Sequence, residues 1–278
     1  MQYIPLDYIK CWVSEEVHDV VLNRLDFQSP FNHKTSELSQ HLEAEVKSIK
    51  FKKFPSGLMT MGGSLHKFKN NGLHNHDSFT LRGFKEVIRE LYQEIGIPPH
   101  YLQIIRMEIG FNLSLNTPID NILNGCIEHK GQRFSSSHSN KMHYLRCAHD
   151  SYFLKVYNKG LQYGLDSNIL RVEVHYKNWQ KHKKNGEVTL WDFINSDKTP
   201  YMEDLLTKWN EIILCEKEIQ DSEHYKYSLP SFWSELSTKS RTTKKRHRDG
   251  LKGLNQRHGK DVQSMVGEAI KKTFIQFQ

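Results

Sequence analysis

The sequence lacks a long apolar run, and this absence excludes a membrane-spanning helix. None of its apolar segments approaches the roughly 18 consecutive apolar residues that such a helix needs. The first residues, MQYIPLDYIKCWV, are too polar for the hydrophobic centre of a secretory signal peptide. We therefore expect a cytoplasmic protein that has no membrane partner.

Cysteine is also scarce and widely spaced. The four cysteines, Cys11, Cys126, Cys147 and Cys215, form no CxxC or CxxxC pair. This spacing indicates neither a disulfide framework nor a cysteine zinc site, so we expect buried thiols. The chain does contain enough apolar sequence, 37% of 278 residues, for one large globular domain or a domain with an appendage.

The positive charge of the chain is concentrated at its C-terminal end. The net charge is +7, and residues 231–278 alone carry eleven Lys or Arg against four acidic residues. The first 230 residues are therefore balanced, with 28 residues of each sign. The sequence describes a neutral body followed by a basic region.

The densest basic segment is STKSRTTKKRHRDGLKGLNQRHGK, residues 237–260, with nine basic residues and one acid. Such a density favours binding to a nucleic-acid backbone, with an affinity that falls steeply as salt rises. Binding to a membrane surface is disfavoured, because the segment has no aromatic or large apolar face. The main alternative to nucleic-acid binding is therefore a segment that is only solvated. The DNA-binding candidates here are Lys244, Lys245, Arg246, Arg248, Lys252 and Arg257.

The spacing of apolar residues predicts the secondary structure. Three-to-four spacing predicts helices over 79–96, 116–129, 199–219 and 261–277. Asp77 or Ser78 is expected to cap the first of these helices, and Thr117 the second, with Pro118 at its first helical position. Apolar or alternating segments predict strands over 3–13, 16–25, 56–68, 101–115, 141–148, 151–159 and 168–176, the third of them broken by glycines.

This order of elements predicts an α+β fold. Three consecutive strands joined by short polar connections indicate an antiparallel sheet, and the helices are expected to pack on one of its faces. We expect an α+β catalytic domain over residues 1–180. A helical, basic C-terminal DNA-binding region is expected over residues 181–278.

Strand alternation places chemically useful side chains together. Arg106, Glu108 and Asn112 share one face of their strand, and Arg171, Glu173 and His175 share one face of theirs. If these two strands are adjacent, Glu108 and Glu173 reach a common surface, where a cation is needed between two carboxylates. Their hard oxygens favour Mg²⁺ or Mn²⁺, which stabilises charge on a phosphate during attack on a phosphodiester.

The segment FLKVYNKG adds a tyrosine and a lysine to this pattern. Tyr157 and Lys159 share a strand face, so the phenolic oxygen is expected near a cation that favours its ionised form. Ordinary strand alternation, or a salt bridge between strands, explains the same pattern without any chemistry. Periodicity alone favours this second interpretation.

Three segments in one order, RMEIGFN, FLKVYNKGLQYG and LRVEVHY, resemble the core of a family of DNA-nicking proteins. The pattern is similar to that of the trans-acting replication initiators of rolling-circle plasmids and of filamentous-phage gene II type replication proteins. In addition, the segment GSLHKFKNNGLHNHDSFT resembles replication-like proteins of Bacteroidetes mobile elements. The resemblance covers about residues 60–180.

The resemblance implies a metal-dependent nickase that initiates replication for a plasmid, phage or mobile element. Such an enzyme cuts one strand by tyrosine attack, stays linked to the 5′ phosphate and leaves a 3′ hydroxyl for a polymerase. Carried over to this chain, Tyr157 is the nucleophile with Lys159 beside it, and Glu108 and Glu173 are the metal ligands. We also expect Arg106 and Arg171 to contact DNA.

Two departures from the pattern bear on catalysis. Asn112 stands where an acid is frequent, and Asn158 replaces the usual Asp before Lys159. The nucleophile also remains open, because Tyr144, Tyr152 and Tyr163 lie in or near the same segments. The pair His74-x-His76 suggests metal ligation less than it suggests a surface or helix-cap role, since it precedes a predicted helix.

Two other classes of protein fit the same sequence. One is a module that binds DNA or RNA without cleaving it, and the other is a structural protein whose basic region only solvates. Two carboxylates near a polyanion favour the enzyme, because they repel phosphate unless a metal neutralises them. The expected partner is origin DNA, single-stranded or as a hairpin, and a homodimer remains open.

Overall fold

The computed structural model describes residues 6–32, 36–139, 142–179, 188–258 and 261–275. It confirms the α+β class, because a large antiparallel sheet combines with helices that continue to the C-terminal region. Within the described ranges, no helix is both long enough and apolar enough to cross a membrane.

The large sheet has nine strands in the order β10-β11-β12-β13-β7-β1-β6-β5-β4. Their bounds are β1 Leu6–Val13, β4 Leu42–Val46, β5 Ile49–Lys53, β6 Met59–Ser64, β7 Leu102–Ser114, β10 Ser135–Ser139, β11 Met142–Ala148, β12 Tyr152–Asn158 and β13 Ile169–Tyr176. Two small sheets consist of β14 Ile212–Leu214, β8 Cys126–His129 and β9 Gln132–Arg133, and of β2 Phe31–Asn32 with β3 Glu37–Leu38.

The chain forms two compact units. Unit 1 comprises residues 1–109, 175–199 and 276–278, and unit 2 comprises residues 110–174 and 200–275. Strands β7 and β13 each contribute residues to both units, so the chain passes between the units inside these strands. The predicted functional division at residue 180 stays a prediction.

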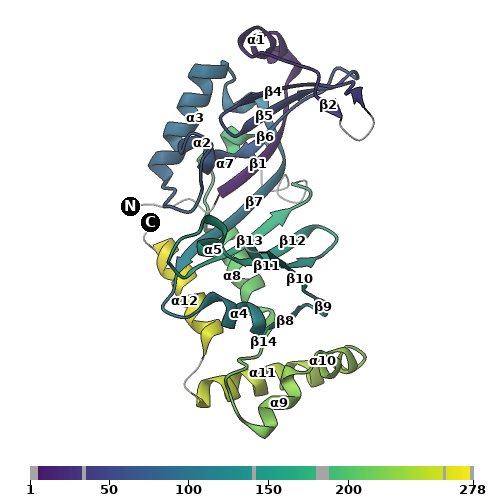
Figure 1. Ribbon diagram of the computed structural model, residues 1–278, viewed down its shortest axis with the longest axis vertical. Helices are drawn as coiled ribbons and strands as arrows, with labels where there is room; N and C mark the ends of the chain where they lie inside the picture. The colour runs from purple at the N-terminus through teal and green to yellow at the C-terminus, as the bar shows by residue number, and fades with distance from the viewer. Residues whose placement is uncertain (1–5, 33–35, 140–141, 180–187, 259–260, 276–278) are drawn as a thin grey trace. The chain divides into compact units, whose positions relative to one another are not determined.

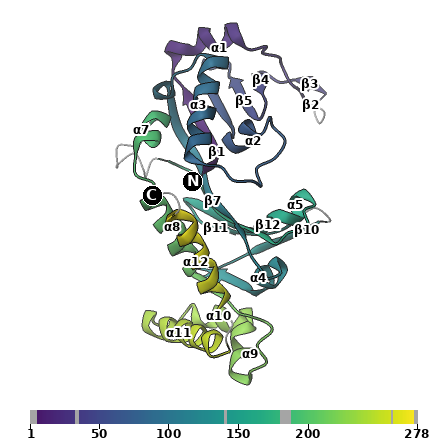
Figure 2. The same cartoon turned by 90° about the vertical axis from the view of Figure 1, so that its left-hand side faces the viewer.

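Unit 1 is built on the antiparallel strands β1, β6, β5 and β4 (Figure 1). Its helices are α1 His18–Arg24, α2 Leu65–Lys69, α3 Leu81–Ile95 and α7 Leu190–Asn195, with the 3₁₀ turns η1 Glu15–Val17 and η2 Pro99–Tyr101. Helix α3 runs beside α2 over this sheet (Figure 2). Its buried side chains, Phe84, Val87, Leu91 and Ile95, follow the predicted spacing.

The ends of α3 show how local chemistry sets a helix. The hydroxyl of Thr80 accepts a hydrogen bond from the N–H of Gly83, so Thr80 is the cap instead of Asp77 or Ser78. Gly96 ends the helix in the left-handed conformation at φ 81°, which glycine adopts without a Cβ clash. The predicted end at Gly96 is therefore confirmed.

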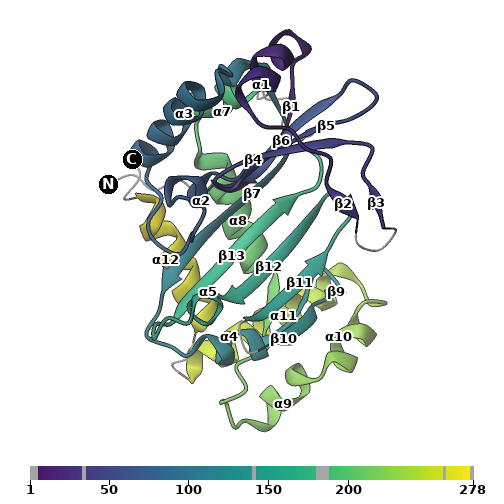
Figure 3. The same ribbon diagram turned by 45° about the horizontal axis from the view of Figure 1, so that its top comes forward.

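Unit 2 contains the strands β10, β11, β12 and most of β13, which lie next to one another in Figure 3. Its helices are α4 Ile119–Gly125, α5 Lys159–Tyr163, α8 Thr199–Asn210, α9 Ser222–Ser228, α10 Pro230–Leu236, α11 Arg241–Arg257 and α12 Val262–Ile275. Helices α8 and α12 are tied together, because the indole N–H of Trp209 donates to the carbonyl of Gln263 at 2.8 Å.

Several predicted elements are wrong. The segment 16–25 forms η1 and α1 because its buried side chains, Val17, His18 and Val21, follow helical spacing, whereas a strand requires alternation. Helix α4 begins one residue late, with Pro118 outside it and no side-chain cap at Thr117. The predicted glycine-broken strand continues through two glycines as β6 and then becomes α2.

Two predicted helices also end early. Cys126 and Ile127 leave the first of them for strand β8, and Ile212 and Ile213 leave the second for strand β14. These two strands pair with each other, Ile212 opposite His129 and Ile213 opposite Glu128. The ladder hydrogen bonds between distant segments therefore override the local helical spacing.

Candidate active site

Tyr157 and Lys159 lie at the junction of β12 and α5. The side chain of Asn158 accepts a hydrogen bond from the N–H of Leu161 at 2.9 Å and so caps α5. A Cβ at Gly160 would lie 2.0 Å from the carbonyl oxygen of Ser167, so only glycine fits there. Each residue of the segment Tyr-Asn-Lys-Gly thus has a local structural role. Tyr157 lies near the end of β12, Asn158 caps α5, Lys159 is the first residue of α5, and Gly160 allows the close approach of Ser167.

Glu173 on β13 is the centre of a buried polar cluster. Its Oε2 accepts from the Tyr157 hydroxyl at 3.3 Å and from Arg171 Nε at 2.9 Å, and its Oε1 accepts from Lys155 Nζ at 3.0 Å. Lys159 Nζ lies 3.4 Å from the Tyr157 hydroxyl oxygen. The structure therefore brings the predicted Tyr157, Lys159, Arg171 and Glu173 together within unit 2.

The cluster is shielded from water. Glu173 is 2% exposed, Lys159 1%, Arg171 3% and Tyr157 8%. Burial acts to raise the pKa of Glu173, but the Lys155 and Arg171 cations outweigh it and lower the pKa to about 2. Glu173 is consequently ionised at neutral pH, and the nearby cations stabilise negative charge on an oxygen placed between them.

Sequence reasoning missed two members of this cluster. Lys155 is not among the predicted site residues, yet strand alternation places it on the face of Tyr157. Asn112, read only as a missing acid, accepts a hydrogen bond from Arg171 at 3.2 Å. Lys155 donates directly to Glu173, and Asn112 accepts from the Arg171 that contacts Glu173.

Glu108 and Arg106 lie on the part of β7 that belongs to unit 1. Glu108 forms an ion pair with His175 Nδ1, and the ring of Tyr8 stacks on His175 with centroids 6.4 Å apart. The pKa of Tyr8 is raised by burial and by the Glu108 charge. Arg106 is exposed and lies opposite Lys10 of β1. A shared site for Glu108 and Glu173 stays a prediction.

The contacts of Glu173 do not fit a divalent cation in this arrangement. Both of its oxygens already accept hydrogen bonds from cationic side chains, and those cations repel a metal ion. Glu108 offers carboxylate oxygens of the kind that Mg²⁺ or Mn²⁺ prefers, but its Oε1 accepts from His175. The metal role of these two residues therefore stays a prediction.

The other tyrosines have different surroundings. Tyr144 lies directly opposite Tyr157 in the β11–β12 pair. Burial raises the pKa of Tyr152 to about 12, and its ring stacks on that of His149. Tyr163 lies under Lys159, whose Nζ is 5.2 Å from its ring centroid. The Tyr157 hydroxyl, in contrast, donates a hydrogen bond to Glu173.

His74 and His76 lie in the connection between α2 and α3, where their rings stack 4.2 Å apart. His74 Nδ1 is 3.2 Å from the amide of Asn70, which also donates to Asp77 at 2.8 Å. The connection therefore has a hydrogen-bonded local structure, and the histidine pair precedes α3 as predicted.

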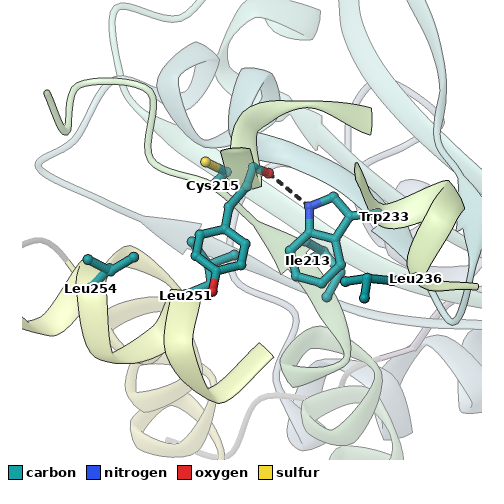
Figure 4. Packing of buried hydrophobic residues seen from close by; sticks show 7 residues of the cluster. Ile213, Cys215, Trp233, Leu236, Leu251 and Leu254 are labelled. Atoms are coloured by element: carbon teal, nitrogen blue, oxygen red, sulfur yellow. Dashed lines mark hydrogen bonds between the residues drawn. The ribbon is translucent and has the colours of Figure 1, made fainter. Parts of the chain in front are cut away.

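Residues 241–257 of the basic segment fold as helix α11, which is anchored to the rest of unit 2. Leu251 and Leu254 pack with Ile213, Cys215, Tyr227, Trp233 and Leu236, as Figure 4 shows. The indole N–H of Trp233 donates to the carbonyl of Tyr227 at 2.8 Å. Burial of apolar area, and not charge, fixes the orientation of α11.

This anchoring decides which basic side chains face water. Lys245, Arg246, Lys252 and Arg257 are exposed, whereas Lys244 and Arg248 are half-buried. Burial raises the pKa of Glu128, and the Arg248 and Lys244 charges act against this rise. The exposed group is the one available to a polyanion from solution.

No family model and no curated protein sequence matches the chain. Among solved structures, the chain is similar to a rolling circle replication initiator protein from Geobacillus stearothermophilus, with 12% identity and a TM-score of 0.41. The match covers 83% of this chain and 93% of the other. A likeness at this level does not establish a shared fold or activity.

Proposed function

We propose that the chain nicks and rejoins one strand of DNA to initiate replication, with Tyr157 as the nucleophile. The observation that carries this proposal is the position of the Tyr157 hydroxyl between the Glu173 carboxylate, at 3.3 Å, and the Lys159 ammonium, at 3.4 Å. A strand tyrosine that only packs needs one hydrogen-bond partner. Two oppositely charged partners both orient the hydroxyl and stabilise charge that develops on its oxygen.

The reaction exchanges one phosphodiester for another. The Tyr157 oxygen attacks phosphorus, the bond to the 3′ oxygen breaks, and the phenolic proton ends on the released 3′ hydroxyl. Glu173, with its pKa lowered to about 2 by its cations against the effect of burial, orients the hydroxyl and does not hold the proton. Lys159 and Arg171 stabilise the added negative charge. The reverse attack by a 3′ hydroxyl rejoins the strand.

Access is the structural requirement for this reaction. Tyr157 is 8% exposed, so a phosphate reaches its oxygen only when a neighbouring side chain moves. Lys155, whose side chain is 25% exposed, is the most accessible partner of Glu173. We propose that the phosphate takes over the Lys155 ammonium from Glu173 on binding. Because Lys155 and Arg171 occupy both oxygens of Glu173, the dependence of the reaction on Mg²⁺ or Mn²⁺ is a separate proposal.

Helix α11 is proposed to hold the DNA near the cluster. Its exposed lysine and arginine side chains supply phosphate contacts, and Arg106 adds an exposed guanidinium in unit 1. Arg171 is buried against Glu173, so its proposed DNA contact is limited to the reacting phosphate.

A second candidate function is binding of DNA or RNA without cleavage. The burial of Tyr157 and Lys159 favours it, because a hydroxyl that stays enclosed never meets a phosphate. In that case the cluster is a buried ion-pair network that supports the sheet, and α11 alone contacts the nucleic acid.

The test is formation of a covalent adduct. The protein is incubated with end-labelled single-stranded DNA of candidate origin sequences, with Mn²⁺, with Mg²⁺ or with EDTA, and a denaturing gel then separates protein-linked DNA. Tyr157→Phe keeps the ring and removes the nucleophile, so the adduct is expected to vanish. Tyr144→Phe, opposite Tyr157 in the sheet, is the matched control and is expected to keep it.

Each outcome separates the alternatives. An adduct that survives in Tyr157→Phe and disappears in Tyr144→Phe moves the nucleophile to Tyr144. If wild-type protein binds DNA but gives no adduct under any of the three conditions, the non-catalytic function is correct. An adduct that forms equally in EDTA removes the proposed metal requirement.

A further inference from the structure

Three metal-binding side chains of unit 2 converge outside the Tyr157 cluster. They are His129 at the end of β8, Cys147 in β11 and His149 just after β11. Their ligand atoms all lie within 4.8 Å of one another. His129 Nδ1 is 2.8 Å from His149 Nε2, and Cys147 Sγ is 3.4 Å from His149 Nε2.

These distances are close to those around a tetrahedral zinc ion. With Zn–N near 2.05 Å and Zn–S near 2.3 Å, a tetrahedron separates two nitrogens by about 3.3 Å and a nitrogen from a sulfur by about 3.5 Å. The Cys147–His149 separation already agrees with this value. The two imidazole nitrogens, 2.8 Å apart, are about 0.5 Å closer than in the tetrahedron, a difference that small side-chain rotations remove.

The surroundings also suit a metal-bound histidine. The second ring nitrogen of His129, Nε2, lies 3.4 Å from Glu211 Oε2 and has no properly aligned hydrogen bond in the structure. When Nδ1 binds a metal, Nε2 carries the proton and faces this carboxylate. A carboxylate behind a ligating imidazole fixes its tautomer and increases its basicity. Lys130 Nζ, 2.9 Å from the same oxygen, balances the charge.

We propose that His129 Nδ1, Cys147 Sγ and His149 Nε2 bind one zinc ion, with water as the fourth ligand. A set of two imidazoles and one thiolate favours Zn²⁺ over Mg²⁺ or Mn²⁺, which prefer oxygen. The ion ties β8 to β11, so it stabilises unit 2. This proposal is independent of DNA cleavage, because none of its ligands belongs to the Tyr157 cluster.

The spacing of the ligands explains why the sequence did not reveal them. Cys147-x-His149 is a short pair, but the third ligand lies 18 residues before Cys147, and no second cysteine is nearby. Only the folding of β8 against β11 brings His129 to the pair. The expectation of a buried thiol is confirmed for Cys147, which is 0% exposed. Its two histidine neighbours were not foreseen.

The metal-free alternative is a chain of hydrogen bonds. In it, the Cys147 thiol donates to the carbonyl of Gln132 at 3.4 Å, and one histidine donates to the other. The two alternatives differ in the ionisation of Cys147, since a metal ligand is a thiolate. Cobalt bound to a thiolate gives a charge-transfer absorption that no hydrogen-bonded thiol gives.

The experiment is a titration of the chelator-treated, full-length protein with Co²⁺, followed by displacement with Zn²⁺. Wild type is expected to bind one Co²⁺ per chain with thiolate absorption, which Zn²⁺ abolishes. Cys147→Ser and His149→Gln are each expected to weaken binding at least tenfold. The matched control is Cys215→Ser, because Cys215 is equally buried and its Sγ lies 3.5 Å from His224 Nε2.

The control isolates the effect of the full ligand set, because Cys215 contacts one histidine, His224. His224 Nε2 in turn contacts Asn255 Oδ1 instead of a second histidine. Cys215→Ser is expected to bind cobalt like wild type. Absence of thiolate absorption in wild type, or unchanged binding in both variants, overturns the proposal. If Cys147→Ser does not fold, His149→Gln decides, because His149 is only half-buried.

Discussion

Replacing Glu173 with Gln should destabilise the protein in a way that depends on pH. The substitution keeps the size of the side chain and removes the charge that Lys155 and Arg171 face. Burial raises the pKa of Glu173, but the two cations lower it by more than burial raises it. The pKa is therefore about 2 instead of the ordinary value of 4.5. The difference corresponds to about 3 kcal/mol of stability at neutral pH.

The sign of the pH dependence follows from the lowered pKa. A carboxylate with a lower pKa in the folded state contributes its full stability above the unfolded pKa and loses it as pH falls through the folded pKa. The contribution of Glu173 is therefore full at pH 7 and declines from about pH 4.5 towards pH 2. At pH 3 about 1 kcal/mol remains.

The assay is urea unfolding of wild type and Glu173→Gln at pH 7, 5 and 3. The difference in unfolding free energy between the two proteins should shrink between pH 5 and pH 3. Glu268→Gln is the control, because it removes an exposed ion pair with Lys271 in the same unit and should change stability little. A difference that stays constant from pH 7 to pH 3 would refute the buried, ionised Glu173.

Two further predictions concern α11 and the close approach of β7 to β13. The double substitution Lys245→Gln with Lys252→Gln removes two exposed charges seven residues apart on one helix face, and should flatten the slope of log K against log salt by about 2 in a DNA-binding titration; an unchanged slope would place the DNA elsewhere. Gly110→Ala places a Cβ 2.4 Å from the carbonyl oxygen of Val172 and should cost about 1–3 kcal/mol of unfolding free energy. Gly253→Ala in α11 meets no atom within 4 Å and should instead stabilise by about 1 kcal/mol; equal effects of the two would contradict the backbone clash.

The strongly periodic elements follow from the amino-acid sequence alone. Helix α3 follows from Phe84, Val87, Leu91 and Ile95, and strands β7, β11, β12 and β13 follow from alternation. Alternation also predicted that Tyr157 and Lys159 share a strand face, but Lys159 begins α5 and lies beside Tyr157 where the strand passes into the helix. The periodic helix and strands depend on residues that are neighbours in the chain, so local backbone geometry is sufficient to predict them.

The features that join distant segments depend on how the strands pair in the folded chain. Ile212 is in a strand and not in the predicted helix because β14 pairs with β8. Glu173 contacts Lys155 across the sheet, and no local spacing in the sequence predicts that contact. The convergence of His129 on Cys147 and His149 is of the same kind. Contacts between residues far apart in the chain depend on strand order and register, which local periodicity does not encode.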